Sequence, residues 1–375
     1  MYVENGKISS RQTFRLYVFD LLGIATLLLP PYLARLCGID GIWAILAGTV
    51  AGFVYLLYLG WVMKRMGTDL CTYLRNTRSG FGQSFVFFLV MIHSIFSAGF
   101  CAYVFANLMQ YALVREISFS VVLLVILFVA AYAVSGGIES RARCYEVLFW
   151  FVLVPFVGMM LASARDFEIL YVNEFFQSEP TQLLRGTYLV FLLLTPLFFS
   201  LFLIGEKEKN YGRNMVKTVG ASILVSGVLL LGSYVLLLGN FGPGSLANMR
   251  YPVVTLMSTI QFEGTFLKRM DALMLAVWFF TLYALLNLHL HYAVGMLKEL
   301  CTNTSSKILP AITRAKWWQV VFPTIGIFVI AWIMEWSHTW VQAFLNYYAY
   351  LAAPLMVLGP GLLVLNRGKG KEIVK

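Results

Sequence analysis

The residues that could do chemistry in this chain lie inside its apolar stretches. The first stretch reads DLLGIATLLLPP at residues 20–31, with a carboxylate, a glycine and two consecutive prolines. Broken backbone persists in a membrane only where protein, water or a ligand satisfies its N–H and C=O groups. Freed amides there bind carboxylates, and freed carbonyls bind ammonium groups or cations. We therefore predict half of a ligand site in this stretch, with a simple proline kink as the alternative. The predicted ligand-binding residues are Gly23, Ile24, Ala25 and Thr26.

Asp20 is the only carboxylate well inside a predicted membrane span. An ionised group buried there costs a few kcal/mol unless it faces a wet cavity or a partner. Its predicted roles are coupling to a cation, relay of a proton or contact with a ligand amine. The alternative is that Asp20 reaches the cytoplasmic interface or pairs with Arg15 or Arg11.

Two other apolar stretches contribute polar groups to the predicted site. The sixth stretch contains FLLLTP at 191–196, which parallels TLLLPP in the first, so we predict that Thr195 and Pro196 form the other half of the site. In the third stretch Ser94, Ser97 and Cys101 form a stripe at helical spacing, for which close helix packing is the favoured reading. Ser97 is predicted to face the ligand.

Tyr283, Asn287 and His291 follow one another at four-residue spacing in the eighth stretch, so they share one helix face. Amide and imidazole groups are costly in lipid, so this face should turn inward, lining a water-accessible path or bonding to a neighbouring helix. We predict Tyr283 and Asn287 as ligand contacts, and His291 with Asp20 as candidates for ion or proton coupling. His289 points elsewhere, and histidines two residues apart do not share a metal, so we expect neither metal nor cofactor.

The composition says what must position these groups. Of the 375 residues, 60% are hydrophobic and only 12% are charged, which indicates a polytopic membrane protein. Ten apolar runs are long enough to cross the bilayer at about 20 residues each. They are 14–36, 41–63, 84–112, 119–135, 144–164, 183–205, 216–238, 272–297, 318–336 and 341–365.

The charges predict an orientation. With both termini in the cytoplasm, 21 of the 28 Lys and Arg residues fall in cytoplasmic segments, as the positive-inside rule requires. The net charge of +10 is therefore explained by topology, with some attraction to anionic lipid. We expect no nucleic-acid partner, because no basic stripe with interleaved aromatic residues occurs.

Ten spans divide into two halves of five. Because five is an odd number of crossings, the second half enters the membrane from the opposite side and is inverted relative to the first. We expect one membrane domain over 1–375, with repeats at about 11–164 and 183–365, and interrupted helices at matching positions mark a central site. After Pro252, apolar residues at helical spacing predict a short amphipathic helix in the outer loop. We predict that it forms a lid over the site; the alternative is a surface helix in the headgroups.

A set of motifs runs in order along most of the chain. RYP at 250–252 precedes the amphipathic stretch and FLKRMDALMLAVW at 266–278, and KISSRQ at 7–12 forms a short polar leader. In order and spacing these motifs resemble the spore germination receptor B-subunit family. Further positions that match its pattern are Gly23, Leu27, Pro30, Gly38, Asp40, Trp43, Gly137, Ile138, Glu139, Arg143, Glu146, Arg269, Asp271 and Trp278.

This resemblance implies a fold, a location and partners. The family belongs to the amino acid–polyamine–organocation superfamily and shares the leucine-transporter fold, with the ligand between broken helices 1 and 6 and helices 3 and 8 as walls. Its members lie in the inner membrane of endospores, assemble with an A subunit and a lipoprotein C subunit, and sense germinants such as amino acids. This chain departs from the family in helix 6, where no glycine or acid occurs between Gly186 and Gly205, which implies a more apolar ligand or none.

We therefore expect an all-α membrane protein with ten helices that acts as the transporter-like subunit of a spore germinant receptor. It would bind a small germinant, an amino acid, at the membrane midplane. No hydrolase constellation, Walker motif or dinucleotide-binding loop is present in the sequence, so an enzyme is not expected. The alternatives are a cation- or proton-coupled secondary amino acid transporter and a scaffold subunit with a vestigial pocket.

Overall fold

The computed structural model describes residues 8–77, 80–113, 116–173, 175–203, 211–259, 271–301 and 315–365, and every regular element in these ranges is helical. The α-helices are α1 (Ser10–Cys37), α2 (Gly41–Met66), α3 (Leu70–Thr77), α4 (Gly80–Ala112), α5 (Phe119–Ser135), α6 (Gly137–Ser163), α7 (Pro180–Leu192), α8 (Tyr211–Asn248), α9 (Pro252–Thr259), α10 (Asp271–Cys301), α11 (Trp317–Trp336), α12 (His338–Tyr347) and α13 (Ala353–Leu365). The 3₁₀ helices are η1 (Gly38–Asp40), η2 (Ala164–Asp166), η3 (Ile169–Val172) and η4 (Thr195–Phe202), and η5 (Tyr348–Ala352) is a π-helix.

Within the described residues, eight helical ranges are long and apolar enough to cross a membrane. One of these ranges contains both α1 and α2, and α5 is a shorter apolar helix of 17 residues. Large apolar side chains such as Leu57, Phe128 and Val147 are exposed on the outside of the bundle. Such a surface suits hydrocarbon, because the helices satisfy their own backbone groups. The chain is a multi-pass membrane protein.

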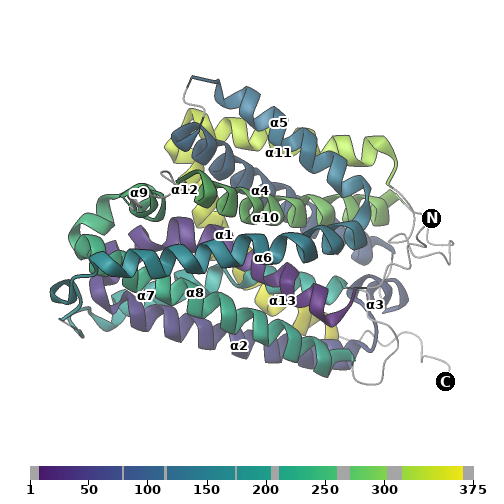
Figure 1. Ribbon diagram of the computed structural model, residues 1–375. Coiled ribbons are helices and arrows are strands. Elements are labelled where there is room, and N and C mark those ends of the chain that lie inside the picture. Colours follow the sequence, from purple (N-terminus) through teal and green to yellow (C-terminus); the bar gives the residue numbers. More distant parts are fainter. Residues whose placement is uncertain are drawn as a thin grey trace.

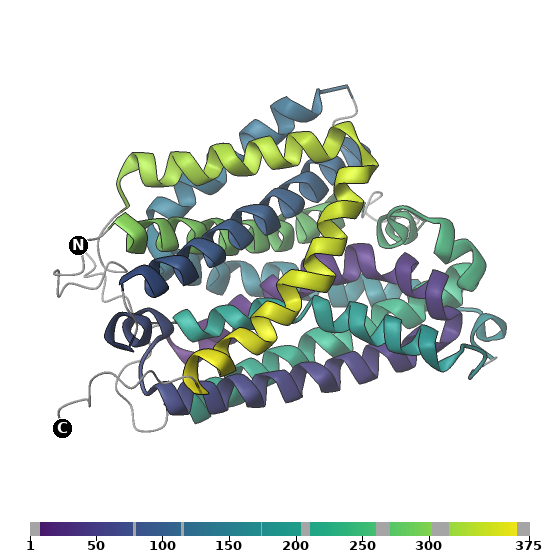
Figure 2. The ribbon, with the colours of Figure 1, turned by 180° about the vertical axis from the view of Figure 1, so that it is seen from behind.

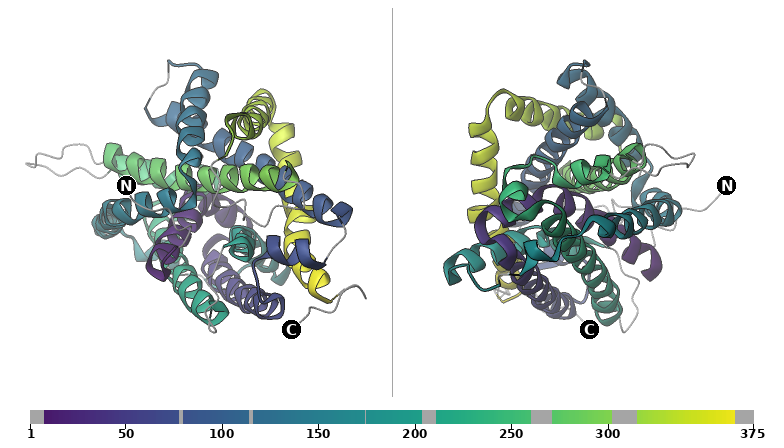
Figure 3. Two further views of the ribbon diagram at one scale, coloured as in Figure 1. Left: turned by 90° about the vertical axis from the view of Figure 1, so that its right-hand side faces the viewer. Right: turned by 60° about the vertical axis from the view of Figure 1, so that its left-hand side comes forward.

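The helices run roughly along one direction and define two ends of the bundle. The start of α1, the end of α13 and α3 lie at one end, while α9 lies at the other (Figure 1). Seen from behind, α12, η5 and α13 cross obliquely over the other helices (Figure 2). Views toward the ends show α1 surrounded by other helices, and it packs against α2, α6, α7, α8, α9 and α10 (Figure 3).

Helix α1 begins with a capping box, in which Gln12 N donates to Ser9 Oγ at 3.3 Å and Ser9 N donates to Gln12 Oε1 at 3.0 Å. From there it continues as one helix to Cys37, with Pro30 and Pro31 inside it. The predicted break at Gly23–Thr26 is therefore wrong. Gly23 has a different role, since a Cβ there would lie 2.8 Å from Thr281 Oγ1, so its small size permits close contact with α10.

The break predicted in the sixth apolar stretch is observed. Helix α7 ends at Leu192, and the chain resumes at Thr195 as the 3₁₀ helix η4, with Pro196 in its first turn. Thr195 Oγ1 donates to Leu192 O at 2.7 Å, so the side chain satisfies a carbonyl that the interrupted helix leaves free. The interruption is buried and faces the interior of the bundle.

The predicted amphipathic helix of the outer loop is also present, as α9. Its residues Val253, Leu256 and Met257 are buried against the bundle, and α9 packs against α1, α6, α8 and α10. A kink precedes it in α8, where Gly242 has φ +70° and is followed by Pro243. Residues 260–270, which include Arg269 of the family motif, lie outside the described residues.

Candidate functional site

A cavity of about 1240 Å³ lies between α1, α4, α7, η4, α10 and α12–η5. It extends from Asp20 in the interior to exposed residues beside α9, including Tyr32, Arg35 and Arg250. Ligand cavities of about 300–1,000 Å³ bury a drug-sized molecule. The cavity therefore has room for a small ligand together with water.

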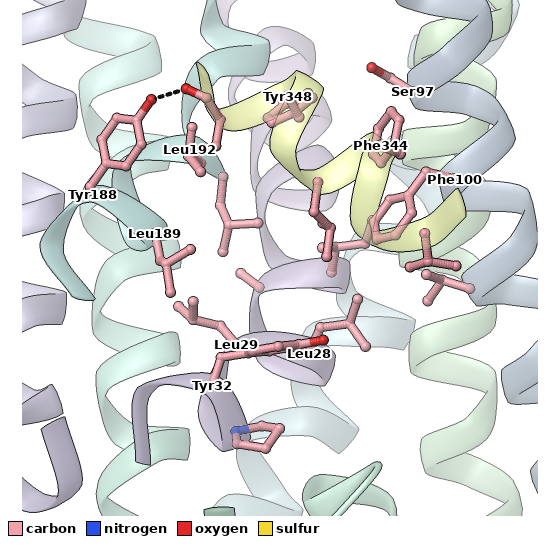
Figure 4. A pocket seen from close by; sticks show the side chains of 18 of the residues that line it. Leu28, Leu29, Tyr32, Ser97, Phe100, Tyr188, Leu189, Leu192, Phe344 and Tyr348 are labelled. Carbon is pink, nitrogen blue, oxygen red and sulfur yellow. Dashed lines mark hydrogen bonds between the residues drawn. The ribbon is translucent and has the colours of Figure 1, made fainter. Parts of the chain in front are cut away.

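Most of the wall is apolar. Figure 4 shows labelled side chains of α1, α4, α7, α12 and η5 arranged around the cavity. The apolar lining residues labelled there are Leu28, Leu29, Phe100, Leu189, Leu192 and Phe344. Phe100 and Phe344 stack with their ring centroids 4.8 Å apart, which joins α4 to α12. A ligand with apolar groups would fit this wall without leaving polar atoms unpaired.

Polar groups gather in the interior part of the cavity. Asp20, Ser97, His289 and Tyr348 all line it. Ser97 Oγ and His93 Nε2 are 3.2 Å apart. The Tyr348 hydroxyl shares a 2.5 Å hydrogen bond with Thr195 Oγ1, so it connects the π-helix to the break before η4. π-helical turns are frequent at functional sites.

The mouth of the cavity is basic. Arg35, Arg185 and Arg250 line it, and all three are exposed. Arg35 Nη2 donates to Ala247 O at 2.6 Å, which joins α1 to the end of α8. Arg250 Nη2 donates to Asn107 Oδ1 at 2.9 Å. Three cations at an entrance attract anionic groups. At physiological salt this attraction is largely screened at distances beyond about 10 Å.

The structure brings together five of the predicted site residues. Asp20, Ile24, Ala25, Ser97 and Pro196 line the cavity. The other predicted ligand contacts do not line it. These contacts are Gly23, Thr26, Thr195, Tyr283 and Asn287. The predicted coupling residue His291 does not line the cavity either.

Physical reasons place those residues elsewhere. Gly23 lies against Thr281 of α10. Thr26 Oγ1 donates to Leu22 O at 2.9 Å and accepts from Trp278 Nε1 at 3.3 Å, so its hydroxyl joins α1 to α10. The Tyr283 hydroxyl donates to Val129 O of α5 at 3.1 Å. For Tyr283 the alternative of an interhelical hydrogen bond is therefore the one observed.

Asp20 has a partner that the sequence analysis did not identify. It forms a buried ion pair with Arg141 of α6, and the two side chains are 2% and 4% exposed. The predicted partners Arg11 and Arg15 instead pair with Glu146, at 2.5 Å and 3.4 Å. Arg141 Nη2 also donates to Ala284 O of α10 at 3.1 Å.

Several residues that line the cavity were not predicted, because they are not part of a regularly spaced row of polar residues in the sequence. His289 lies on a different face of α10 from Tyr283, Asn287 and His291, as predicted. It is this face, which also carries Leu285 one turn before His289, that lines the cavity. That four-residue spacing was the available signal. Tyr348 and Phe344 lie in an apolar run that gives no hint of a π-helix.

The order of residues along most of the chain identifies its family. Residues 7–338 match the spore permease family, described as spore germination protein. The chain belongs to this family. Spore germination protein B2 of Bacillus subtilis (strain 168) is 24% identical over 280 residues, which cover 72% of this chain and 74% of that protein. Spore germination protein A2 of the same organism is 20% identical over 317 residues, 81% of this chain and 84% of that protein.

The fold of this spore permease is that of a known transporter. A Na⁺-coupled sialic acid symporter in a substrate-bound, outward-open state superimposes with a TM-score of 0.65. The alignment covers 96% of this chain and 78% of that chain, at 11% sequence identity. Identity that low shows a shared fold and does not transfer a ligand. The protein is thus a transporter-like germination protein, and its family and fold are those of permeases.

Proposed function

We propose that this spore permease is the membrane subunit of a spore germinant receptor, and that the cavity between α1, α4, η4 and α10 binds the germinant. The single observation that carries the proposal is the cavity itself, which meets the broken helix at Pro196 and combines an apolar wall with Asp20, Ser97 and His289. Concave, mostly apolar sites with a few convergent polar groups are typical of small-molecule binding.

The proposed germinant is a small amphiphilic molecule, an amino acid. Its polar end would lie near Asp20, Ser97 and His289, and its apolar part would contact side chains such as Leu28 and Phe100. Binding would bias an equilibrium between cavity states, because a ligand shifts the population toward the state it binds more tightly. The change would pass to a receptor A subunit and a lipoprotein C subunit, our proposed partners.

The proposed topology is one membrane domain over 1–375 that crosses the inner spore membrane ten times. Its two halves of five helices are inverted relative to each other, and both termini lie on the cytoplasmic side. In support, each of the ten predicted apolar runs overlaps one helix or two or three consecutive helices. The start of α1 and the end of α13 lie at the same end of the bundle (Figure 1). Reporter fusions at Gly67 and Lys209 should report cytoplasm and one at Asn248 the outside; the opposite pattern contradicts the topology.

A second candidate function is a secondary amino acid transporter coupled to a cation or a proton, through the predicted coupling residues Asp20 and His291. The fold favours it, because the structural neighbour is a Na⁺-coupled symporter. A scaffold with a vestigial pocket is a third candidate, and the size of the cavity argues against it.

Proteoliposomes that contain the purified protein separate these functions. Binding of an amino acid without accumulation is expected for the receptor subunit. Accumulation of an amino acid driven by an ion gradient would contradict a pure receptor and support the transporter. If no member of an amino acid and nucleoside panel binds, the scaffold is supported instead.

A further inference from the structure

The turn that joins α1 to α2 carries a sequence motif that has no part in the cavity. Gly38, Asp40 and Trp43 belong to this turn and do not line the cavity. The Asp40 carboxylate instead accepts two main-chain hydrogen bonds from the segment between α6 and α7, from Phe176 N at 2.6 Å and from Ser178 N at 2.8 Å. The ring of Phe176 stacks on that of Trp43, with the ring centroids 5.5 Å apart. The motif thus holds this segment against the beginning of α2.

The same segment is held at further points. Ser178 Oγ donates to Cys37 O at 2.8 Å, and Glu168 N donates to Gly239 O of α8 at 2.9 Å. Phe176 has φ +65°, a left-handed conformation that a bulky residue keeps only where its surroundings impose it. The contacts with the turn impose it here. The segment therefore presents its side chains in fixed directions.

Several of the side chains that it presents are large, apolar and exposed. Ile169, Leu170 and Phe176 are 70%, 82% and 78% exposed, and Phe175 is 42% exposed. We call these four residues the apolar tip. The segment that carries it connects α6 to α7 and lies at the end of the bundle where α9 lies (Figure 1). Large apolar side chains that gather on an exposed surface mark an interaction site.

Helix α2 shows where the apolar tip lies relative to the bilayer. One face of α2 carries a row of exposed apolar residues at helical spacing, which are Trp43, Leu46, Val50, Val54, Leu57 and Trp61. Such a row suits hydrocarbon, and tryptophan favours the membrane–water interfaces. Trp43 and Trp61 are 18 residues apart, about 27 Å of helix, and the hydrocarbon is about 30 Å thick. Trp43 therefore marks the membrane–water interface at the α9 end of the bundle.

We propose that the apolar tip inserts into the bilayer at the α9 end of the bundle, at the boundary between the headgroups and the acyl chains. Its partner is lipid, because Phe176 stacks on the first residue of the lipid-facing row of α2, so the tip continues that row at the edge of the hydrocarbon. Apolar side chains of interfacial segments lie about 5–10 Å deep in this boundary. The inference does not depend on what the cavity binds and goes beyond the proposed germinant receptor.

Quenching of tryptophan fluorescence by brominated lipid tests this inference. The full chain is reconstituted in phosphatidylcholine vesicles whose acyl chains carry bromine either near the headgroup or near the chain end. The fluorescence that a new tryptophan adds is the difference between the variant and the wild type. Leu170→Trp should lose most of its added fluorescence when the bromine lies near the headgroup, and clearly less when it lies near the chain end.

Two control variants define the limits of the measurement. Val50→Trp lies in the middle of the lipid-facing row of α2 and is quenched more strongly by bromine near the chain end. Asn248→Trp lies at an exposed position beside the mouth of the cavity and is quenched by neither lipid. If Leu170→Trp does not fold, Ile169→Trp makes the same test at the neighbouring exposed position.

Two results overturn the inference. Quenching of Leu170→Trp that is no stronger than that of Asn248→Trp would show that the apolar tip faces water or another protein. Quenching with the depth profile of Val50→Trp would place the segment inside the hydrocarbon and not at its boundary.

Discussion

Gly23 offers a sharp test of how α1 packs in the bundle. An alanine Cβ at this position would lie 2.8 Å from Thr281 Oγ1, 2.9 Å from Thr281 Cβ and 3.0 Å from its carbonyl carbon, whereas ordinary contacts lie at 3.4–4 Å. Thr281 is held in place, because its hydroxyl donates to Val277 O at 2.9 Å. Gly23→Ala therefore forces α1 and α10 apart by about half an ångström in a close-packed interior.

The expected cost follows from two opposing terms. Overpacking of a well-filled core costs about 1–3 kcal/mol, while alanine is favoured over glycine inside a helix by about 0.5–1 kcal/mol. The net loss should be about 1–2 kcal/mol, which lowers the apparent Tm of a chain of this length by roughly 1–3 °C.

The assay is thermal unfolding of the purified protein, with two comparisons. Gly295→Ala on α10 is the matched control, because a Cβ there meets nothing within 4 Å, and its Tm should not fall. In a Thr281→Gly background the side-chain contacts are gone, so Gly23→Ala should cost less there. A Gly23→Ala variant as stable as the wild type, or an equal cost in both backgrounds, would refute the packing role of Gly23.

Three further substitutions have defined outcomes. Asp20→Asn leaves Arg141 buried without its counter-charge and should cost about 3–5 kcal/mol in thermal unfolding; a loss below about 1 kcal/mol would contradict the ion pair. Thr26→Val leaves the Trp278 indole N–H without its acceptor and should cost about 1–3 kcal/mol without changing ligand affinity, and a large loss of affinity would return Thr26 to the binding site. Tyr348→Phe removes one hydroxyl from the cavity, so ligand affinity in a thermal-shift titration should fall. The free energy of unfolding without ligand should fall by only about 0.5–1.5 kcal/mol. Unchanged affinity would exclude that hydroxyl from the site.

Long apolar runs predicted the helices well, because the need to satisfy backbone groups in hydrocarbon leaves few other structures. The helix interruptions were predicted less well, although the two proline-containing stretches, at 26–31 and 191–196, have similar sequences. Thr195–Pro196 marks a real change from α-helix to 3₁₀ helix, whereas Pro30 and Pro31 lie inside the unbroken α1. A proline removes one donor wherever it occurs, and packing against neighbouring helices decides whether the helix continues.

The partner of Asp20 could not be predicted from charge clusters. Arg141 was counted among the cytoplasmic basic residues because the predicted run began at residue 144, but α6 begins at Gly137. Arg141 therefore lies about one turn inside α6, within the bundle, where it contacts α1 and α10. Similarly, the polar stripe Tyr283–Asn287–His291 was predicted to face the ligand, whereas the face with His289 lines the cavity. The spacing of residues shows which of them share a helix face, but it does not show which face turns toward the cavity.

Ligand binding to the Ala25→Phe variant tests the central claim most directly, because Ala25 lines the cavity and is only 6% exposed. The measurement is a thermal-shift panel of amino acids and nucleosides on the wild type, on Ala25→Phe and on Ala47→Phe, which makes the same change at an exposed residue of α2. We predict that at least one amino acid raises the Tm of the wild type and of Ala47→Phe but not that of folded Ala25→Phe. An equal rise in all three proteins would contradict a ligand site in this cavity.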